Sequence, residues 1–187
     1  MNRRMYIGVA STPAAATVDT AGEGGFYGFT VDIINAGSNT KISGGAEQNY
    51  VYQFVLYFRA VISKVSSEIR TAEVGKFYGL GIYDINKDLV VRTAQIGMDA
   101  TGIQETALVA SATLEPGVYY YAQTTDGTTG ELRGTILGTA SMTIMNEGSE
   151  NRVGRAANDG VAGVLPATMG DITATVNRSP AVAFFKP

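Results

Sequence analysis

The sequence predicts an all-β domain, built as an antiparallel β-sandwich or jelly roll. Segments in which apolar and polar residues alternate recur along the chain, and most are rich in β-branched or aromatic residues. Turn-forming residues separate these segments at roughly regular intervals, as in sandwiches and barrels. No window carries a sustained 3.6-residue apolar stripe with helix caps. A parallel α/β sheet, which needs helices between its strands, is therefore disfavoured.

The longest predicted strand covers residues 50–62. One face carries Tyr50, Tyr52, Phe54, Leu56, Phe58, Ala60 and Ile62, and the other carries Gln53, Tyr57 and Arg59. Further strands are predicted at 25–34, 65–71, 77–85, 89–96, 103–108, 117–125, 135–145 and 181–185. Turns rich in Gly, Pro, Asn or Asp lie at 36–40, 84–88, 115–117 and 125–130.

Two segments leave more than one interpretation. Residues 60–70 contain helix formers beside Val and Ile, so a helix there is a less favoured alternative to strand. Residues 146–176 are polar and rich in glycine. Within them, the proline-containing sequence Leu165-Pro-Ala-Thr-Met169 forms a rigid interruption. We predict a long loop that returns to the last strand and offers contacts to neighbouring subunits.

Composition excludes several classes of function. The 187 residues fit one domain, which can bury a core because 45% of them are apolar. Cysteine and histidine are both absent, which rules out disulfides, Ser-His-Asp triads and zinc sites with Cys or His ligands. A net charge of −3 argues against binding to nucleic acid or to an anionic membrane, and no apolar segment is long enough to span a bilayer. No cofactor is expected.

Two short motifs resemble parts of ligand-binding loops, but we favour a structural role for each. Asp84-Ile-Asn-Lys-Asp88 resembles the start of a calcium loop, but Leu89 and Gln95 stand where glycine and glutamate are required, so we predict a hairpin turn. Gly79 and Gly81 match half of a dinucleotide fingerprint without its third glycine or its helix. On a strand, such glycines indicate close packing by a large neighbouring side chain.

Tyrosines and carboxylates supply the candidate ligand contacts. Tyr83, Tyr119, Tyr121 and Asp126 could form a sugar-binding surface, since aromatic rings stack on sugars and carboxylates bind their hydroxyls. Alternation places Tyr120 opposite Tyr119 and Tyr121, and at least one of these faces must be core, so core packing or a subunit interface is the favoured role. Glu105, Glu115, Glu131, Asp159 and Asp171 could contain a glycosidase pair, but their spacing selects no two of them.

From residue 50 onward, the order of motifs resembles the small β-jelly-roll domains of tailed-bacteriophage virion proteins. The matching pieces are Tyr52-Gln-Phe-Val55, Gly79-Leu-Gly-Ile-Tyr-Asp84, Leu89-Val-Val91, Thr101-Gly102, Ala112-Thr-Leu-Glu-Pro-Gly-Val-Tyr-Tyr120, Gly163-Val-Leu-Pro-Ala-Thr168 and Ser179-Pro-Ala-Val-Ala183. The resemblance implies an all-β, antiparallel sandwich of jelly-roll type with a short N-terminal arm. It also implies a virion component without catalytic residues that is often trimeric.

On this basis we expect a structural protein of the bacteriophage virion, such as a head decoration, a spike or a fibre-tip subunit on the capsid or tail surface. Its partners would be further copies of itself, with a trimer favoured, and the major capsid or tail proteins. Residues 1–24 would form an anchoring arm with Arg3, Arg4 and Tyr6 as contacts, and residues 25–187 would form the single domain.

Two other classes of function remain open. Jelly rolls also serve as lectins, so a carbohydrate-binding module for a host surface glycan is the main alternative. An enzyme that cleaves polysaccharide through paired carboxylates is the third interpretation, and it requires two close carboxyl groups in a cleft.

Overall fold

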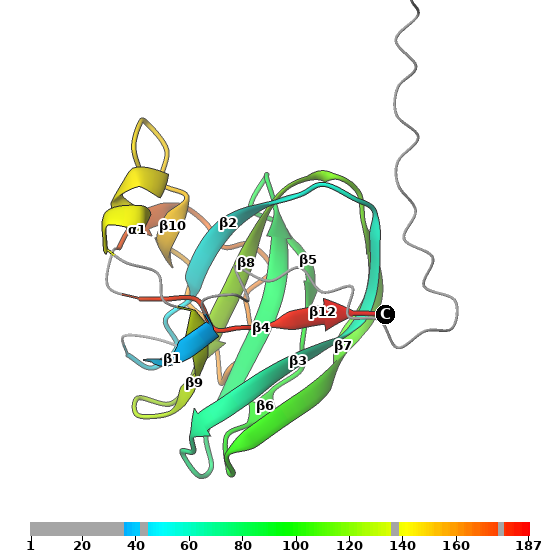
Figure 1. The fold of residues 1–187 in the computed structure, drawn as a ribbon, viewed down its shortest axis with the longest axis vertical. Coiled ribbons are helices and arrows are strands. Elements are labelled where there is room, and N and C mark those ends of the chain that lie inside the picture. The colour runs from blue at the N-terminus through cyan, green and yellow to red at the C-terminus, as the bar shows by residue number, and fades with distance from the viewer. Residues whose placement is uncertain (1–35, 42–44, 136–138, 176–177) are drawn as a thin grey trace, which may run out of the picture.

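The computed structural model describes residues 36–41, 45–135, 139–175 and 178–187, and strands dominate them (Figure 1). The strands are β1 (Ala36–Lys41), β2 (Tyr50–Leu56), β3 (Ala60–Thr71), β4 (Phe77–Asp84), β5 (Leu89–Arg92), β6 (Ile96–Gly97), β7 (Gly102–Leu114), β8 (Gly117–Thr125), β9 (Glu131–Thr135), β10 (Val153–Ala156), β11 (Ile172–Ala174) and β12 (Phe184–Lys186). One short helix, α1 (Thr139–Met145), completes the described elements. The predicted all-β fold class is confirmed.

The strands form two antiparallel sheets that pack against each other. The seven-stranded sheet has the order β11-β10-β2-β8-β4-β5, with β6 also paired to β4. The five-stranded sheet has the order β1-β9-β3-β12, with β7 paired to β3. From β2 to β4 and from β6 to β10, the chain crosses between the sheets at each connection. The sandwich is confirmed, whereas jelly-roll connectivity stays a prediction.

The main core lies between the two sheets. It contains Tyr50, Tyr52, Leu56, Ile62, Val65, Ile69, Tyr78, Leu80, Ile82, Tyr121, Leu132, Phe185 and further buried residues. In β4, Tyr78, Leu80 and Ile82 recur at every second position because a strand sends alternate side chains to one face. Burial of this set supplies the main driving force for folding.

The predicted single strand at 50–62 is wrong, because the chain turns a corner at residues 57–59. Here β2 leaves the seven-stranded sheet and β3 enters the five-stranded one. Leu56, half-buried Phe58 and Ala60 all contact the same core, so the apolar alternation continues through the corner. Tyr57, on the opposite side, is 82% exposed.

Residues 60–70 form strand and not helix, and an irregularity in β3 explains their mixed pattern. The pairing of β3 with β7 shifts between Ile62 and Lys64, whose partners are Ala112 and Ala107. Ile62 and Val65 are both buried although they lie three positions apart, because the shift in pairing, with extra residues in β7, changes which face each position occupies. The predicted strand at 65–71 is therefore the second half of β3.

Several other predictions need correction. Part of the segment predicted as strand at 135–145 is helix α1, in which Met142 and half-buried Met145 lie one turn apart and pack on the core. The predicted strand at 89–96 is divided into β5 and β6, and the strand at 181–185 shortens to β12. The sequence patterns missed β1, β9, β10 and β11. The strand predicted at 25–34 lies outside the described residues.

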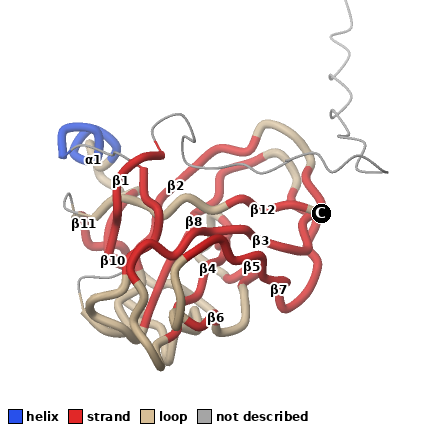
Figure 2. The backbone as a smooth tube through the Cα atoms, turned by 60° about the horizontal axis from the view of Figure 1, so that its bottom comes forward, coloured by secondary structure: helices blue, strands red, loops and turns tan. Residues whose placement is uncertain are grey.

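The predicted loop after β10 crosses the outer face of the seven-stranded sheet, and we call its residues 157–171 the strap. Its two ends meet, since Ala157 N donates a hydrogen bond to Asp171 O (2.8 Å). Leu165 and Met169 enter a second core with Val51, Tyr83, Tyr120, Ala122, Ala156 and Ile172. Loop segments gather below β10 in Figure 2, while α1 and the C terminus lie at opposite ends of the molecule. Both faces of this sheet thus carry buried apolar side chains.

Glycines let the strap approach the sheet. A Cβ on Gly79 would lie 2.1 Å from the carbonyl oxygen of Gly163, and one on Gly81 would lie 2.7 Å from Leu165 Cδ1. The Gly81 contact confirms the prediction that a large side chain packs against this strand. Ala162 and Gly163 form the two-residue tip of the strap with φ values of 49° and 75°, as in hairpin turns of type I′.

Candidate functional site

Two of the four predicted contact residues, Tyr83 and Tyr121, lie inside the protein. Tyr83 is 0% exposed, and its hydroxyl donates to Pro166 O of the strap (2.8 Å). Tyr121 is 3% exposed in the main core, where its ring centroid lies 6.1 Å from that of Tyr52. Burial raises the pKa of both hydroxyls. Neither side chain presents surface to a sugar, so core packing, the favoured alternative, is their role in this chain.

Tyr119 and Asp126 are half-buried and lie far apart. Tyr119 donates its hydroxyl to Glu115 O (2.8 Å) and stacks on Phe54, with ring centroids 5.9 Å apart. Asp126 accepts a hydrogen bond from Phe77 N at Oδ1 (2.6 Å). The two residues stand near opposite ends of β8, roughly 20 Å apart at the rise of a strand. The structure therefore does not bring the four predicted residues together.

Each of the five candidate carboxylates has a charged or hydroxyl partner among the described residues. Glu105 pairs with Lys64 and Lys186, Glu115 with Arg59, Asp159 with Arg155 and Asp171 with Lys87, while Glu131 accepts a hydrogen bond from Thr71. Each carboxylate thus has its own partner, on a different element. The described residues also contain no group of three or more His, Cys, Asp or Glu side chains that could hold a metal ion.

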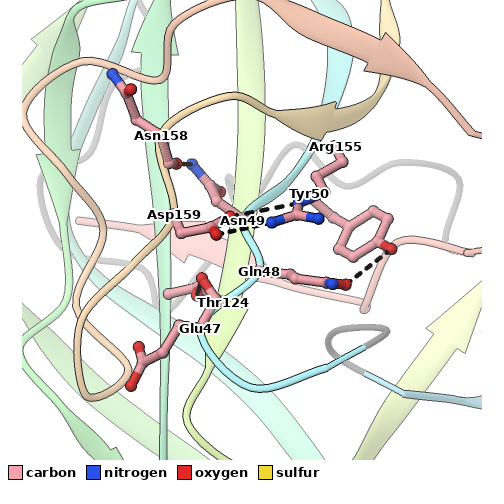
Figure 3. Close-up of polar contacts among 8 residues, drawn as sticks. All are labelled: Glu47, Gln48, Asn49, Tyr50, Thr124, Arg155, Asn158 and Asp159. Atoms are coloured by element: carbon pink, nitrogen blue, oxygen red, sulfur yellow. Dashed lines mark hydrogen bonds and ion pairs between the residues drawn. The ribbon is translucent and has the colours of Figure 1, made fainter.

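The densest polar cluster lies where β2 begins and the strap departs from β10, as Figure 3 shows. Glu47 adopts a φ of 68°, which is uncommon for a residue other than glycine. Its N–H donates to Thr125 O (2.6 Å), and its carbonyl accepts from Gly160 N (2.7 Å). Its Oε1 accepts from Ala162 N at the tip of the strap (2.9 Å). Glu47 thus ties β8 and two points of the strap together.

Asn49 and the ion pair beside it fix the base of the strap. Asn49 is 0% exposed, and its Nδ2 donates to Asn158 O (3.5 Å). Arg155 Nη2 lies 2.7 Å from Asp159 Oδ2, across the first turn of the strap (Figure 3). Glu47 Oε2 and Asn49 Oδ1 are buried without a partner among the described residues. The remaining side-chain polar atoms of Glu47 and Asn49 bind protein backbone, which indicates that the cluster positions the strap.

The outer face of the five-stranded sheet is open and charged. Residues 65, 67 and 69 of β3 point into the core, which leaves Lys64, Glu68 and Arg70 on the outer face. Glu68 pairs with Arg70 (2.8 Å) and with Arg133 of β9 (3.1 Å). Hydrogen bonds from Arg133 and then Arg70 lower the pKa of Glu68. No other described element covers this face of the sheet.

Two exposed features were not among the predicted site residues. The first is Tyr57. The alternation of residues 50–62 places it on the outer face, and this pattern could have identified it as an exposed aromatic residue. The second feature is the length of β7, of which only residues 103–108 were predicted as strand. Arg3, Arg4 and Tyr6 of the predicted arm lie outside the described residues.

Comparison with known proteins gives no relative: no family model, curated protein or solved structure matches this chain. Among the residues that the structure describes, no helix has the length and apolar character needed to cross a membrane.

Proposed function

We propose that this protein is a structural component of a tailed-bacteriophage virion, a decoration, spike or fibre-tip subunit. It would act through symmetric oligomerisation and attachment to capsid or tail proteins, with a trimer favoured. The observation that carries the proposal is that the strap covers the outer face of one sheet of the sandwich and not that of the other. No other described segment covers the outer face of the second sheet or its β7 edge at residues 102–107, which leaves both for protein contacts.

Two further points support the proposal. The order of motifs from residue 52 to residue 183 resembles virion jelly rolls, and the structure assigns these motifs to an antiparallel sandwich. The carboxylates that a polysaccharide-cleaving enzyme would need are separately paired among the described residues. The absence of catalytic activity stays a prediction.

The copy number of the protein in purified particles tests the proposal. Quantitative mass spectrometry would compare it with the major capsid protein. A ratio close to one indicates a head decoration, and a few copies per particle indicate a spike or fibre on the tail or a vertex. Complete absence from particles would overturn the virion role.

The anchoring arm has its own test. Deleting residues 1–16, which include Arg3, Arg4 and Tyr6, should abolish attachment to the particle while the far-ultraviolet circular dichroism of the domain stays unchanged. Attachment at the wild-type level would show that the anchor lies elsewhere.

Binding of a host surface glycan is the second candidate function, and exposed Tyr57 is the observation that favours it. An aromatic ring that is 82% exposed offers the flat apolar surface on which sugars stack. On a glycan array, the wild-type protein should bind a defined set of glycans and the Tyr57→Ala variant should lose it. The Tyr119→Phe variant, which changes only a half-buried hydroxyl, is the control.

A further inference from the structure

The edge of the five-stranded sheet at β7 has the features of an acceptor for an added strand. Among the described residues, β7 pairs with β3 along one side, and its other side makes a single bridge, from Leu108 to Thr93. Residues 102–107 therefore present alternate backbone N–H and C=O groups at an open edge.

Natural proteins usually protect such an edge with lysine, proline or a very short strand. Residues 102–107 have the sequence Gly-Ile-Gln-Glu-Thr-Ala, which contains neither lysine nor proline. The only charged side chain, Glu105, is turned to the sheet face, where it pairs with Lys64 and Lys186. Ile103, also on the outer face, is 79% exposed. The edge is thus long, apolar in part and unprotected along these six residues.

The chain also contains a suitable occupant. In residues 25–34, Tyr27, Phe29, Val31 and Ile33 alternate with Gly28, Thr30 and Asp32. This pattern is typical of a strand with one apolar face, which needs a partner to cover that face.

Geometry decides which copy can provide this segment to β7. Asn35 alone separates the segment from β1, which lies at the opposite edge of the same sheet from β7. The strands β9 and β3 stand between, so the distance is about three strand spacings, or roughly 14 Å. One residue spans about 3.5 Å at most. A link of one residue is therefore too short for the whole segment to pair with β7 of its own chain.

We propose that residues 25–34 of one copy add as a strand to the β7 edge of a second copy. The contact joins two different surfaces, so it is heterologous, and copies related by a 120° rotation would close into the favoured trimer. Main-chain hydrogen bonds would provide affinity, and Tyr27, Phe29, Val31 and Ile33 would extend the core of the acceptor. This inference rests on the proposed oligomeric virion role and adds the interface to it.

Two matched pairs of variants of the full chain test the interface. Val31→Asp places a charge on the apolar face of the segment, and Thr30→Asp places it on the other face. Thr106→Lys places a charge on the core-facing side of the acceptor edge, because Thr106 pairs with buried Val65, and Ile103→Lys places it on the exposed outer side of the same strand. Sedimentation velocity should show that Val31→Asp and Thr106→Lys each weaken the oligomer about tenfold or more. Thr30→Asp and Ile103→Lys should leave it unchanged.

Disulfide formation between copies gives a second readout, because the natural chain has no cysteine. Variants with cysteine at position 28, 30 or 32 would be mixed with Ala107→Cys, which lies exposed on the outer face of β7. At least one mixture should form a disulfide-linked dimer. A mixture with Ala167→Cys, exposed on the strap, should form none.

The outcomes separate this inference from the proposed function. A monomeric full chain, equal effects within either matched pair, or no disulfide at position 107 would overturn the strand exchange. If the protein is nevertheless present in particles, the virion role stands with another interface. Absence from particles would reject the virion role whatever the oligomeric state in solution.

Discussion

The α-carbon of Gly79 faces the carbonyl group of Gly163, and a Cβ on Gly79 would lie 2.1 Å from that oxygen. A backbone group of the strap therefore occupies the space where any other residue of β4 would place its side chain. This contact couples the sequence of a central strand to the position of a segment more than eighty residues away along the chain.

Replacing Gly79 by alanine should destabilise the protein. The added methyl group meets backbone, which cannot move aside as a side chain would, so we expect the free energy of unfolding to fall by about 1–3 kcal/mol. Urea denaturation measures the change. Gly117→Ala is the control, because its Cβ would meet Tyr119 Cε2 at an ordinary 3.6 Å. Similar losses in both variants would contradict the close approach.

Truncating Leu165 should loosen the strap. Leu165 is 3% exposed in the second core, and Leu165→Ala should lower the free energy of unfolding by about 2–5 kcal/mol. Hydrogen exchange should accelerate at the Leu89 amide, which donates to Ala167 O of the strap (2.9 Å). Val161→Ala removes a side chain that is 74% exposed on the same segment and should have little effect. Unchanged exchange in Leu165→Ala would show that Leu165 does not hold the strap.

Glu73 should make stability depend on pH in the acidic range. Burial raises the pKa of its carboxyl, but hydrogen bonds from the backbone of Thr129, Gly130 and Thr128 outweigh burial and leave the pKa below its usual value. A lowered folded-state pKa means that the stabilisation is complete above the unfolded-state pKa of about 4.3 and is lost as the pH falls through the folded-state value.

The measurement is urea denaturation from pH 6 to pH 2.5. Glu73→Gln should reduce stability near pH 6 and flatten the acidic part of the profile. Glu150→Gln, at an exposed position, should reproduce the wild-type profile. A Glu73→Gln profile as steep as the wild type would exclude Glu73 as the source of the acid sensitivity.

Removing the hydroxyl of Tyr121 should stabilise the protein. This oxygen is buried and has no hydrogen-bond partner among the described residues, so Tyr121→Phe should raise the free energy of unfolding by about 1 kcal/mol. The neighbouring Tyr52 donates its hydroxyl to Arg178 O (3.1 Å), and Tyr52→Phe should lower the free energy by a similar amount. Denaturation of both variants side by side is the test, and a loss of stability in both would show that Tyr121 has a partner as well.

The fold class followed from the sequence because alternation is a local property. Strand β8 has the predicted bounds, since its run of aromatic and β-branched residues lies between two turns that contain glycine. The corner at Tyr57 could not be predicted from the alternation. Because β2 and β3 face the same core, apolar residues continue at every second position through the turn. The bulge after Ile62 depends on pairing with β7, which no local pattern encodes.

The candidate site was harder to predict because exposure depends on distant segments. Tyr83 belongs to a strand face that would be open if the strap did not cover it. The strap itself is rich in glycine and polar residues, so its two apolar anchors, Leu165 and Met169, carried no periodic signal. Tyr57, at a corner that no other described segment covers, kept the exposure that its place in the alternation indicated.

The strap has a consequence for the symmetry of any assembly. A sandwich with two bare faces can stack on either of them and grow without limit in both directions. Here the strap covers the outer face of the seven-stranded sheet, so the two outer faces of each subunit differ. An assembly that uses the open face or the β7 edge would therefore leave the strap on its surface, and the rotation between copies would decide between a ring and a fibre.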